Sequence, residues 1–441
     1  MVCVGTRLAR RPAGRVSEAI VDGAERQGAY GLLESEAVGA DEIATAVFES
    51  TARACAEEDF VFCPVDGTSL TLTDHDSSKG FGSIGSRNNG ASGLKVMNAM
   101  ALSSDGVALG VTSQRWWVRP KHRRRRHRDE LRPEQKETQH WLDAIKQTRE
   151  VIAKHAPNTR CWFQLDREAD AWPTLMEAGL GDHWFTIRAS RNRRVVLPDG
   201  RYSNLWQWLA QQPVKATYEL TVRGTPKRQA RIAHMVVRAC QVTLVLRDKR
   251  TKQRFLAVVN VVQAREQGTT PAGEPPLDWT LLTNRPIQNR KHLTDVVFGY
   301  SMRWRIEDLH RTWKSGACRV EENQLRSASA VIKWATILIA VAARIERIKH
   351  LSREEPDRPA SDEFSPTEIK ATVLLRFGKS GRGKPAPDAR PTLGQVTLWI
   401  AELGGYTGRT SSGGPPGSIV LARGLESVRA AAQALEALTS D

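Results

Sequence analysis

The stretch Phe60-Val-Phe-Cys-Pro-Val-Asp66 is an apolar run that ends in an acidic residue. Short apolar runs bounded by turn residues are typical of buried β-strands. The run Arg160-Cys-Trp-Phe-Gln-Leu-Asp166 has the same character and also ends in an aspartate. We therefore expect two buried strands, each with an aspartate at its carboxyl end.

The segments around these two strands predict how they are connected. Three consecutive strands are expected first, then a helix, the strand that ends at Asp166, a short helix and a fifth strand. This order is that of a ribonuclease-H-like α/β domain, in which the acids ending the first and fourth strands, here Asp66 and Asp166, lie side by side. The other elements are expected as strands over residues 93–102 and 107–118, a helix over 133–154, a helix ending near Gly179 and a strand over 183–189.

The rest of the chain divides into segments of distinct composition. Beyond residue 190, alternating β-branched segments predict a β-rich insertion, and a long apolar helix is expected from Ser327 to His350. Residues 1 to about 15 show no clear period and are expected to be poorly ordered. The expected parts are an N-terminal helical segment (1–59), the first part of a ribonuclease-H-like core (60–190), an inserted β-rich subdomain (191–290), the second part of the core (291–351) and a C-terminal helical module (367–441).

The composition limits the class of partner and the compartment. The 441 residues include 65 Lys and Arg against 49 Asp and Glu, which gives a net charge of +16. Such a charge suits a polyanion, most commonly nucleic acid. The six cysteines form no CxxC motif, which argues against a zinc site. The longest apolar run, Val331 to Ile345, contains Lys333 and is too short to span a bilayer, so we expect a soluble, cytoplasmic protein with no membrane segment.

A second informative stretch, Tyr300 to Lys314, sets one carboxylate among cations at helical spacing. At about 100° per residue, one helix face would carry Tyr300, Arg303, Glu307, Arg311 and Lys314. One interpretation is a solvated amphipathic helix whose Arg303, Glu307 and Arg311 form i,i+4 pairs. The other is a carboxylate that works beside phosphates.

A run of cations between the third strand and the following helix offers a further contact for phosphates. It extends from Lys121 to Arg128 and includes Arg123, Arg124, Arg125 and Arg126. No folded core buries such a run. A solvated loop is the alternative, but the net charge of the chain favours contact with a phosphate backbone.

Two aspartates at neighbouring strand ends and one helix glutamate would form a ligand set made only of oxygens. Asp66, Asp166 and Glu307 are the candidates. Oxygen ligands suit Mg²⁺ or Mn²⁺, and a pair of such ions can activate an attacking oxygen and stabilise a leaving one in phosphodiester displacement.

Four stretches resemble the DDE transposases of the insertion-sequence-four class. They are Asp66-Gly-Thr-Ser, Asp166-Arg-Glu-Ala-Asp170, Asp278-Trp-Thr-Leu-Leu-Thr and the helix Tyr300-x2-Arg303-x3-Glu307-x6-Lys314. The resemblance implies that Asp66, Asp166 and Glu307 hold two catalytic metal ions, and that Tyr300, Arg303 and Lys314, with Arg311 on the same face, grip phosphates. It also implies that Trp279 and Trp304 hold a base flipped out of the DNA, although Trp279 has the alternative of a core residue on a strand.

The function implied by this resemblance is cut-and-paste DNA transposition with a hairpin intermediate. The partners would be the inverted repeats at the element ends, target DNA and a second copy of the chain. One alternative is a ribonuclease-H-like nuclease without strand transfer. Another is an N-terminally truncated, non-catalytic DNA-binding protein that inhibits transposition, because only the last part of the family's N-terminal DNA-binding region, around Val16 to Glu58, is recognisable.

Overall fold

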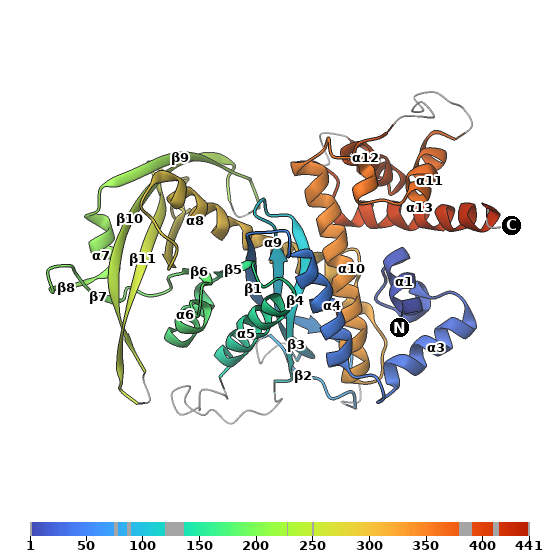
Figure 1. Ribbon diagram of the computed structural model, residues 1–441, viewed down its shortest axis with the longest axis horizontal. Helices are drawn as coiled ribbons and strands as arrows, with labels where there is room; N and C mark the ends of the chain where they lie inside the picture. The colour runs from blue at the N-terminus through green and yellow to red at the C-terminus, as the bar shows by residue number, and fades with distance from the viewer. Residues whose placement is uncertain are drawn as a thin grey trace. The chain divides into compact units, whose positions relative to one another are not determined.

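The computed structural model shows a mixed α/β protein with a large mixed sheet (Figure 1). It describes residues 2–74, 78–85, 90–119, 136–226, 228–248, 251–378, 390–408 and 414–439. The chain forms two compact units. The first unit comprises residues 1–55, 67–122 and 305–441, and the second unit comprises residues 56–66 and 123–304. Strand β1 (Phe60–Thr71) passes from the second unit into the first, between Asp66 and Gly67.

The second unit contains the parallel part of the sheet. β1 pairs in parallel with β5 (Arg160–Leu165), and β5 pairs in parallel with β6 (Trp184–Arg188). The strands expected at these places are present, but β1 continues five residues beyond Asp66, where the sequence predicted its end. Consecutive residues of both apolar runs are buried, as is typical of strands in a parallel sheet. The helices that follow β4 and β5 along the chain are α5 (Thr138–His155) and α6 (Trp172–Ala178).

The predicted β-rich insertion extends the sheet beyond β6. It adds β12, β11 and β10 in antiparallel order, with β9 and β7 both paired to β10, and β10 and β11 form a long hairpin (Figure 1). The short elements β7, β8 and α7 were missed because three to six residues carry no clear period. Helix α8 (Arg290–Met302) follows β12 and contacts β5, β6 and β11. The bounds are β7 Arg194–Val196, β8 Tyr202–Asn204, α7 Leu205–Ala210, β9 Val214–Val222, β10 Arg231–Arg247, β11 Arg254–Gln267 and β12 Asp278–Thr283.

The first unit contains the antiparallel strands and most of the helices. β3 hydrogen-bonds with β1, and it pairs antiparallel with β2 and β4. α4 and α10 both contact β4 and each other (Figure 1). The bounds are α2 Val16–Ala19, α3 Gly23–Glu34, α4 Ala40–Ala54, β2 Gly82–Ser83, β3 Ser92–Leu102, β4 Ala108–Trp117, α9 Trp304–Lys314 and α10 Ala328–Glu354.

The expectation that the first 15 residues are poorly ordered is wrong. They contain helix α1 (Val2–Arg10), whose Leu8 is fully buried. The indole of Trp334 on α10 donates a hydrogen bond of 2.7 Å to the carbonyl of Gly14. The sequence feature that indicates this helix is a pair of apolar residues, Val4 and Leu8, at helical spacing among arginines.

Helix α10 is longer than the sequence indicated. By length and composition its 27 residues are sufficient to cross a membrane, so the expectation that this run is too short is wrong. However, 67% of its most apolar window is buried within the protein. The ammonium of Lys333, near the start of the run, donates to the carbonyls of Leu33 and Ser35, at 3.0 and 2.6 Å. α10 therefore forms the core of the first unit.

The C-terminal helices α11 (Pro366–Phe377), α12 (Leu393–Leu403) and α13 (Ser418–Thr439) pack on one another. Glycines allow α12 and α13 to approach closely. A Cβ on Gly404 would lie 1.8 Å from the carbonyl oxygen of Val420, and a Cβ on Gly424 would lie 1.8 Å from that of Ile400. The two helices therefore meet backbone to backbone at this crossing.

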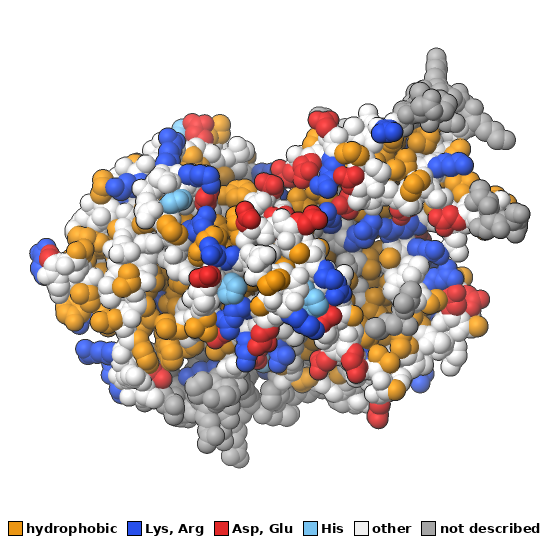
Figure 2. All heavy atoms as spheres, viewed as in Figure 1, with side chains coloured by type: hydrophobic (Ala, Val, Ile, Leu, Met, Phe, Trp, Pro, Cys, Tyr) orange, Lys and Arg blue, Asp and Glu red, His pale blue; other side chains and the backbone are white. Residues whose placement is uncertain are grey.

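The surface carries exposed apolar side chains as well as dispersed basic ones. Apolar side chains are visible over the hairpin of β10 and β11 (Figure 2), and Leu256 and Val258 of β11 are more than half exposed. Lys and Arg side chains are dispersed over the same view, as the net charge of +16 leads one to expect.

Candidate functional site

The register of β1 and β5 brings two of the predicted site residues to the same level of the sheet. The strands pair in parallel from Phe60 with Arg160 to Pro64 with Gln164. Asp66 and Asp166 each lie two residues beyond that last pair, and neighbouring strands are about 4.8 Å apart. The two residues therefore lie at the same level on adjacent backbones. Asp166 follows the last residue of β5, whereas Asp66 lies within β1, which continues to Thr71, so the expectation that this strand ends at Asp66 is wrong.

The turn that carries Asp166 is anchored by a second aspartate. Asp166 accepts a hydrogen bond of 2.7 Å from the N–H of Glu168 and so caps a single 3₁₀ turn. At the end of the turn, the fully buried carboxylate of Asp170 accepts from the N–H and hydroxyl of Ser190, at 2.7 and 2.9 Å, and from Arg193 at 2.5 Å. Sequence reasoning gave Asp170 no role, and it missed Ser190 and Arg193, which lie 20 or more residues away.

The end of helix α8 and strand β12 contribute three of the predicted DNA-contact residues to the second unit. Arg303 is buried, and its Nη1 lies 3.4 Å from Oδ2 of Asp66. Tyr300 is buried as well, and burial raises the pKa of its hydroxyl, with a further upward contribution from the charge of Asp166. The ring of Trp279 on β12 meets the ring of Tyr300 edge to face at 5.7 Å.

The expected continuous helix from Tyr300 to Lys314 is interrupted. α8 ends at Met302 and α9 begins at Trp304, because the N–H of Arg303 bonds three residues back, to the carbonyl of Tyr300. The prediction of one regular helix with a single shared face is therefore wrong at Arg303. Trp304 is 54% exposed, and the guanidinium of Arg303 lies 5.1 Å from its ring centroid.

The remaining predicted residues belong to the first unit. Glu307 lies half-buried in the first turn of α9. Lys314, at the end of α9, lies 3.4 Å from the hydroxyl of Thr68 and 3.6 Å from Glu321. Arg311 is exposed and pairs with Asp308 at 3.0 Å. The four arginines at 123–126 lie outside the described residues.

The donor set of the two aspartates fits a hard divalent cation. Asp66, within β1, and Asp166, just after β5, offer carboxylate oxygens from the same level of the sheet, and both side chains are partly accessible. Arg303 supplies positive charge to Asp66 from the other side. Carboxylate oxygens are the ligands that Mg²⁺ and Mn²⁺ prefer.

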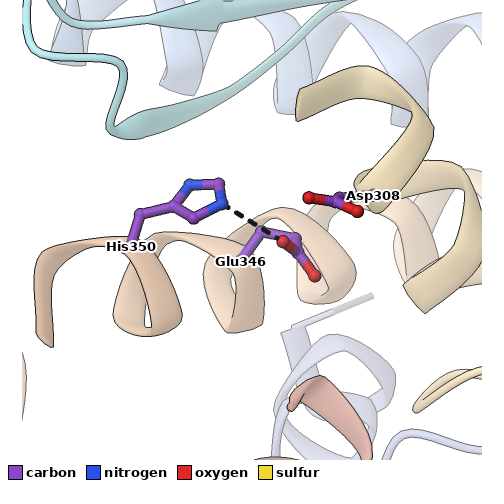
Figure 3. A group of neighbouring side chains, drawn as sticks. All are labelled: Asp308, Glu346 and His350. Carbon is purple, nitrogen blue, oxygen red and sulfur yellow. Dashed lines mark ion pairs between the residues drawn. The ribbon is translucent and has the colours of Figure 1, made fainter. Parts of the chain in front are cut away.

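A second group of side chains of metal-binding type lies in the first unit and was not anticipated. Asp308 on α9 and Glu346 and His350 on α10 have ligand atoms within 4.8 Å of one another (Figure 3). However, the ammonium of Lys349 contacts Glu346 and lies 4.0 Å from Asp308. The cluster is therefore already neutralised by a cation of the chain itself.

No protein-family model matches this sequence. The residues and their geometry therefore carry the functional argument.

A buried histidine on α9 makes the stability of the first unit depend on pH. The side-chain amide of Asn98 lies 2.9 Å from Nε2 of His310, and burial lowers the pKa of His310 to about 3, with Lys314 adding to the effect. The unfolded chain takes up a proton near pH 6.5, whereas the folded chain does not. We therefore expect His310 to cost about 1.4 kcal/mol of unfolding free energy for each pH unit below about 6.5, down to about 3. Urea denaturation at a series of pH values from 6.5 to 4.5 measures this effect: the unfolding free energy of His310→Gln should fall less steeply with decreasing pH than that of wild type.

Proposed function

We propose that this chain is a DDE transposase of the insertion-sequence-four class, which cleaves and joins DNA strands at the ends of a mobile element. The register that sets Asp66 beside Asp166 carries the proposal, since two carboxylates at the same level of adjacent parallel strands suit metal-dependent phosphodiester chemistry. The Tyr300, Arg303 and Trp279 side chains close to these strand ends add support.

The strand arrangement supports a ribonuclease-H-like core as part of the proposal. β3 lies between β4 and β1 in the first unit, and β5 lies between β1 and β6 in the second unit. The first and fourth strands of the expected core are thus neighbours, and the two parallel pairings follow the expected order.

The proposed roles follow from the chemistry of each side chain. Asp66 and Asp166, with Glu307 as the third carboxylate, would hold the metal ions. When bound, these ions supply activation of the attacking oxygen and stabilisation of the leaving oxygen. Arg303 would bring positive charge to the phosphate next to Asp66, and its burial fixes the guanidinium. Lys314 would hold a second phosphate by charge.

A groove in the second unit suits a base that leaves the DNA stack. It encloses about 420 Å³, and its walls include Tyr218, Trp279, Val297 and Phe298. An aromatic wall with few charges favours stacking of a flat ring. We therefore assign the groove, with Trp279, to the flipped base of the hairpin step.

Trp279→Ala should reduce the yield of hairpin ends while first-strand nicking continues. The flipped base would lose a stacking contact worth about 1–3 kcal/mol. Nicks and hairpins can be separated on denaturing gels after incubation with a donor plasmid that carries this coding sequence and its native flanking DNA. Trp206→Ala is the matched control, because Trp206 is exposed on α7 of the same unit and lies outside the groove.

The same donor plasmid tests the proposal as a whole. Wild-type protein with Mg²⁺ should release the element by double-strand breaks at both ends, and a plasmid without the flanking DNA should remain uncut. Two ends cut in concert require at least two protomers, for which the helices after residue 366 are the proposed contact. Nicks without any joined product would favour a nuclease that lacks strand transfer.

A further inference from the structure

Helix α9, which carries Glu307, is tied to α10 by a buried carboxylate. The side chain of Glu346 on α10 is 0% exposed. Its Oε1 accepts a hydrogen bond of 2.5 Å from the hydroxyl of Thr312 on α9. Its Oε2 contacts the ammonium of Lys349, which also lies 4.0 Å from Asp308 on α9. Two residues of α9, Thr312 and Asp308, thus converge on the Glu346–Lys349 pair of α10. Figure 3 shows Asp308 facing Glu346.

The burial of Glu346 gives these contacts their strength. A carboxylate withdrawn from water is strongly destabilising unless ionic and hydrogen-bonding partners replace the lost hydration. Thr312 and Lys349 are those partners. Lys349 lies on α10 itself, so a displacement of α9 along α10 would remove the hydrogen bond from Thr312 and leave Oε1 of Glu346 unsatisfied. Apolar packing alone tolerates small sliding, whereas a charge-assisted hydrogen bond fixes the position.

His350 completes the cluster without competing for Glu346. Its ring is fully buried, and Nε2 lies 3.4 Å from Oε2 of Glu346. Burial, together with Arg305, Lys349 and Arg353, lowers the pKa of His350 to about 2, so the ring is neutral. With Lys349 already on the carboxylate and two further arginines nearby, the cluster is an internal ion pair and not a cation site.

The same threonine links α9 to the C-terminal helices. Thr312 Oγ1 lies 2.9 Å from the hydroxyl of Ser418, the first residue of α13. The single proton of Thr312 is directed to the carboxylate, so Ser418 is the donor in this second contact. The start of α13, the hydroxyl of Thr312 and the carboxylate of Glu346 therefore form one chain of contacts.

We propose that Glu346 and Thr312 are positioning residues for Glu307, and that Ser418 makes the position of α9 sensitive to the seating of α13. This inference rests on the proposed function for the role of Glu307, but not for the coupling of the three helices. It identifies a route by which the C-terminal helices would regulate strand cleavage.

Hydrogen exchange on the full-length chain tests the coupling without any catalytic readout. Thr312→Val removes the hydroxyl while keeping the shape, and should speed amide exchange in α9 roughly 10–100-fold. Thr312→Ser should restore slow exchange. Thr336→Val is the matched control, because Thr336 is buried on α10 and its hydroxyl has no hydrogen-bond partner among the described residues, so α9 should exchange as in wild type. Ser418→Ala, at the start of α13, should also speed exchange in α9.

Cleavage of the donor plasmid across a range of Mn²⁺ concentrations tests the positioning role. Thr312→Val should need more Mn²⁺ for half-maximal cutting and lose roughly 10–100-fold in rate, with DNA binding unchanged and with rescue by Thr312→Ser. If the amides of α9 exchange at the wild-type rate in both Thr312→Val and Ser418→Ala, the proposed coupling is wrong. If Thr312→Val and Thr312→Ser lose cleavage rate equally, the hydroxyl has no positioning role. If instead Glu307→Gln cuts like wild type, the proposed function fails while the exchange result still decides the coupling.

Discussion

Replacing Asp66 or Asp166 by asparagine should abolish DNA strand cleavage while DNA binding survives. Each change removes one of the two carboxylates that the register of β1 and β5 sets at the same level, but keeps the shape of the side chain. The loss of several kcal/mol of transition-state stabilisation corresponds to roughly a thousandfold or more in rate. Cutting of the donor plasmid in Mg²⁺ and in Mn²⁺, with gel-shift affinity on the same DNA, provides the measurement.

Matched controls exist on the same elements. Asp59→Asn lies just before the opposite end of β1, and Glu168→Gln lies on the turn next to Asp166, and both residues are exposed. These two variants should cut at the wild-type rate. Metal-dependent cutting by Asp66→Asn or Asp166→Asn would show that the aligned carboxylates are not the catalytic pair.

The largest effect on stability is expected for Arg193→Ala in the second unit. Arg193 and Asp170 are 9% and 0% exposed, so loss of the guanidinium leaves an uncompensated buried carboxylate. Breaking a buried pair of this kind costs about 3–5 kcal/mol of unfolding free energy. Urea denaturation followed by tryptophan fluorescence should show a clearly lower midpoint.

The double variant Asp170→Asn, Arg193→Met separates the charge effect from simple loss of packing. It removes both charges together and should recover most of the midpoint lost in Arg193→Ala. Arg201→Ala breaks the exposed Asp199–Arg201 pair and should leave the midpoint unchanged. If Arg193→Ala unfolds at the wild-type midpoint, then Asp170 does not depend on its partner.

Sequence alone predicted the strands of the core and the alignment of Asp66 with Asp166. Apolar runs report burial directly, and the strand order then restricts which strand ends can be neighbours. Arg303 was assigned to phosphate, but its contact with Asp66 was not predicted, because the two residues are 237 positions apart. Periodicity describes which side of a helix is buried, not which distant side chain it meets.

The buried polar clusters were beyond sequence reasoning for the same reason. In the sequence, Glu346 is one charge in a long apolar helix. Its structural role depends on a hydrogen bond from Thr312, 34 residues earlier, and on the ion pair with Lys349. The break at Arg303 was also missed, since one shifted backbone hydrogen bond leaves no trace in the spacing of apolar residues. The mixed α/β class could be predicted from local pattern, whereas the contacts around Asp66 and Glu346 are long-range.

The crossing of α12 and α13 limits how this chain can diverge over generations. At Gly404 and Gly424 even a methyl group would collide with a main-chain carbonyl, which cannot rotate aside as a side chain can. Apolar positions around the crossing can exchange for residues of similar volume at small cost. Mutational drift should therefore remodel most of the module while these two glycines persist, and a random library selected for function would show them as isolated invariant positions.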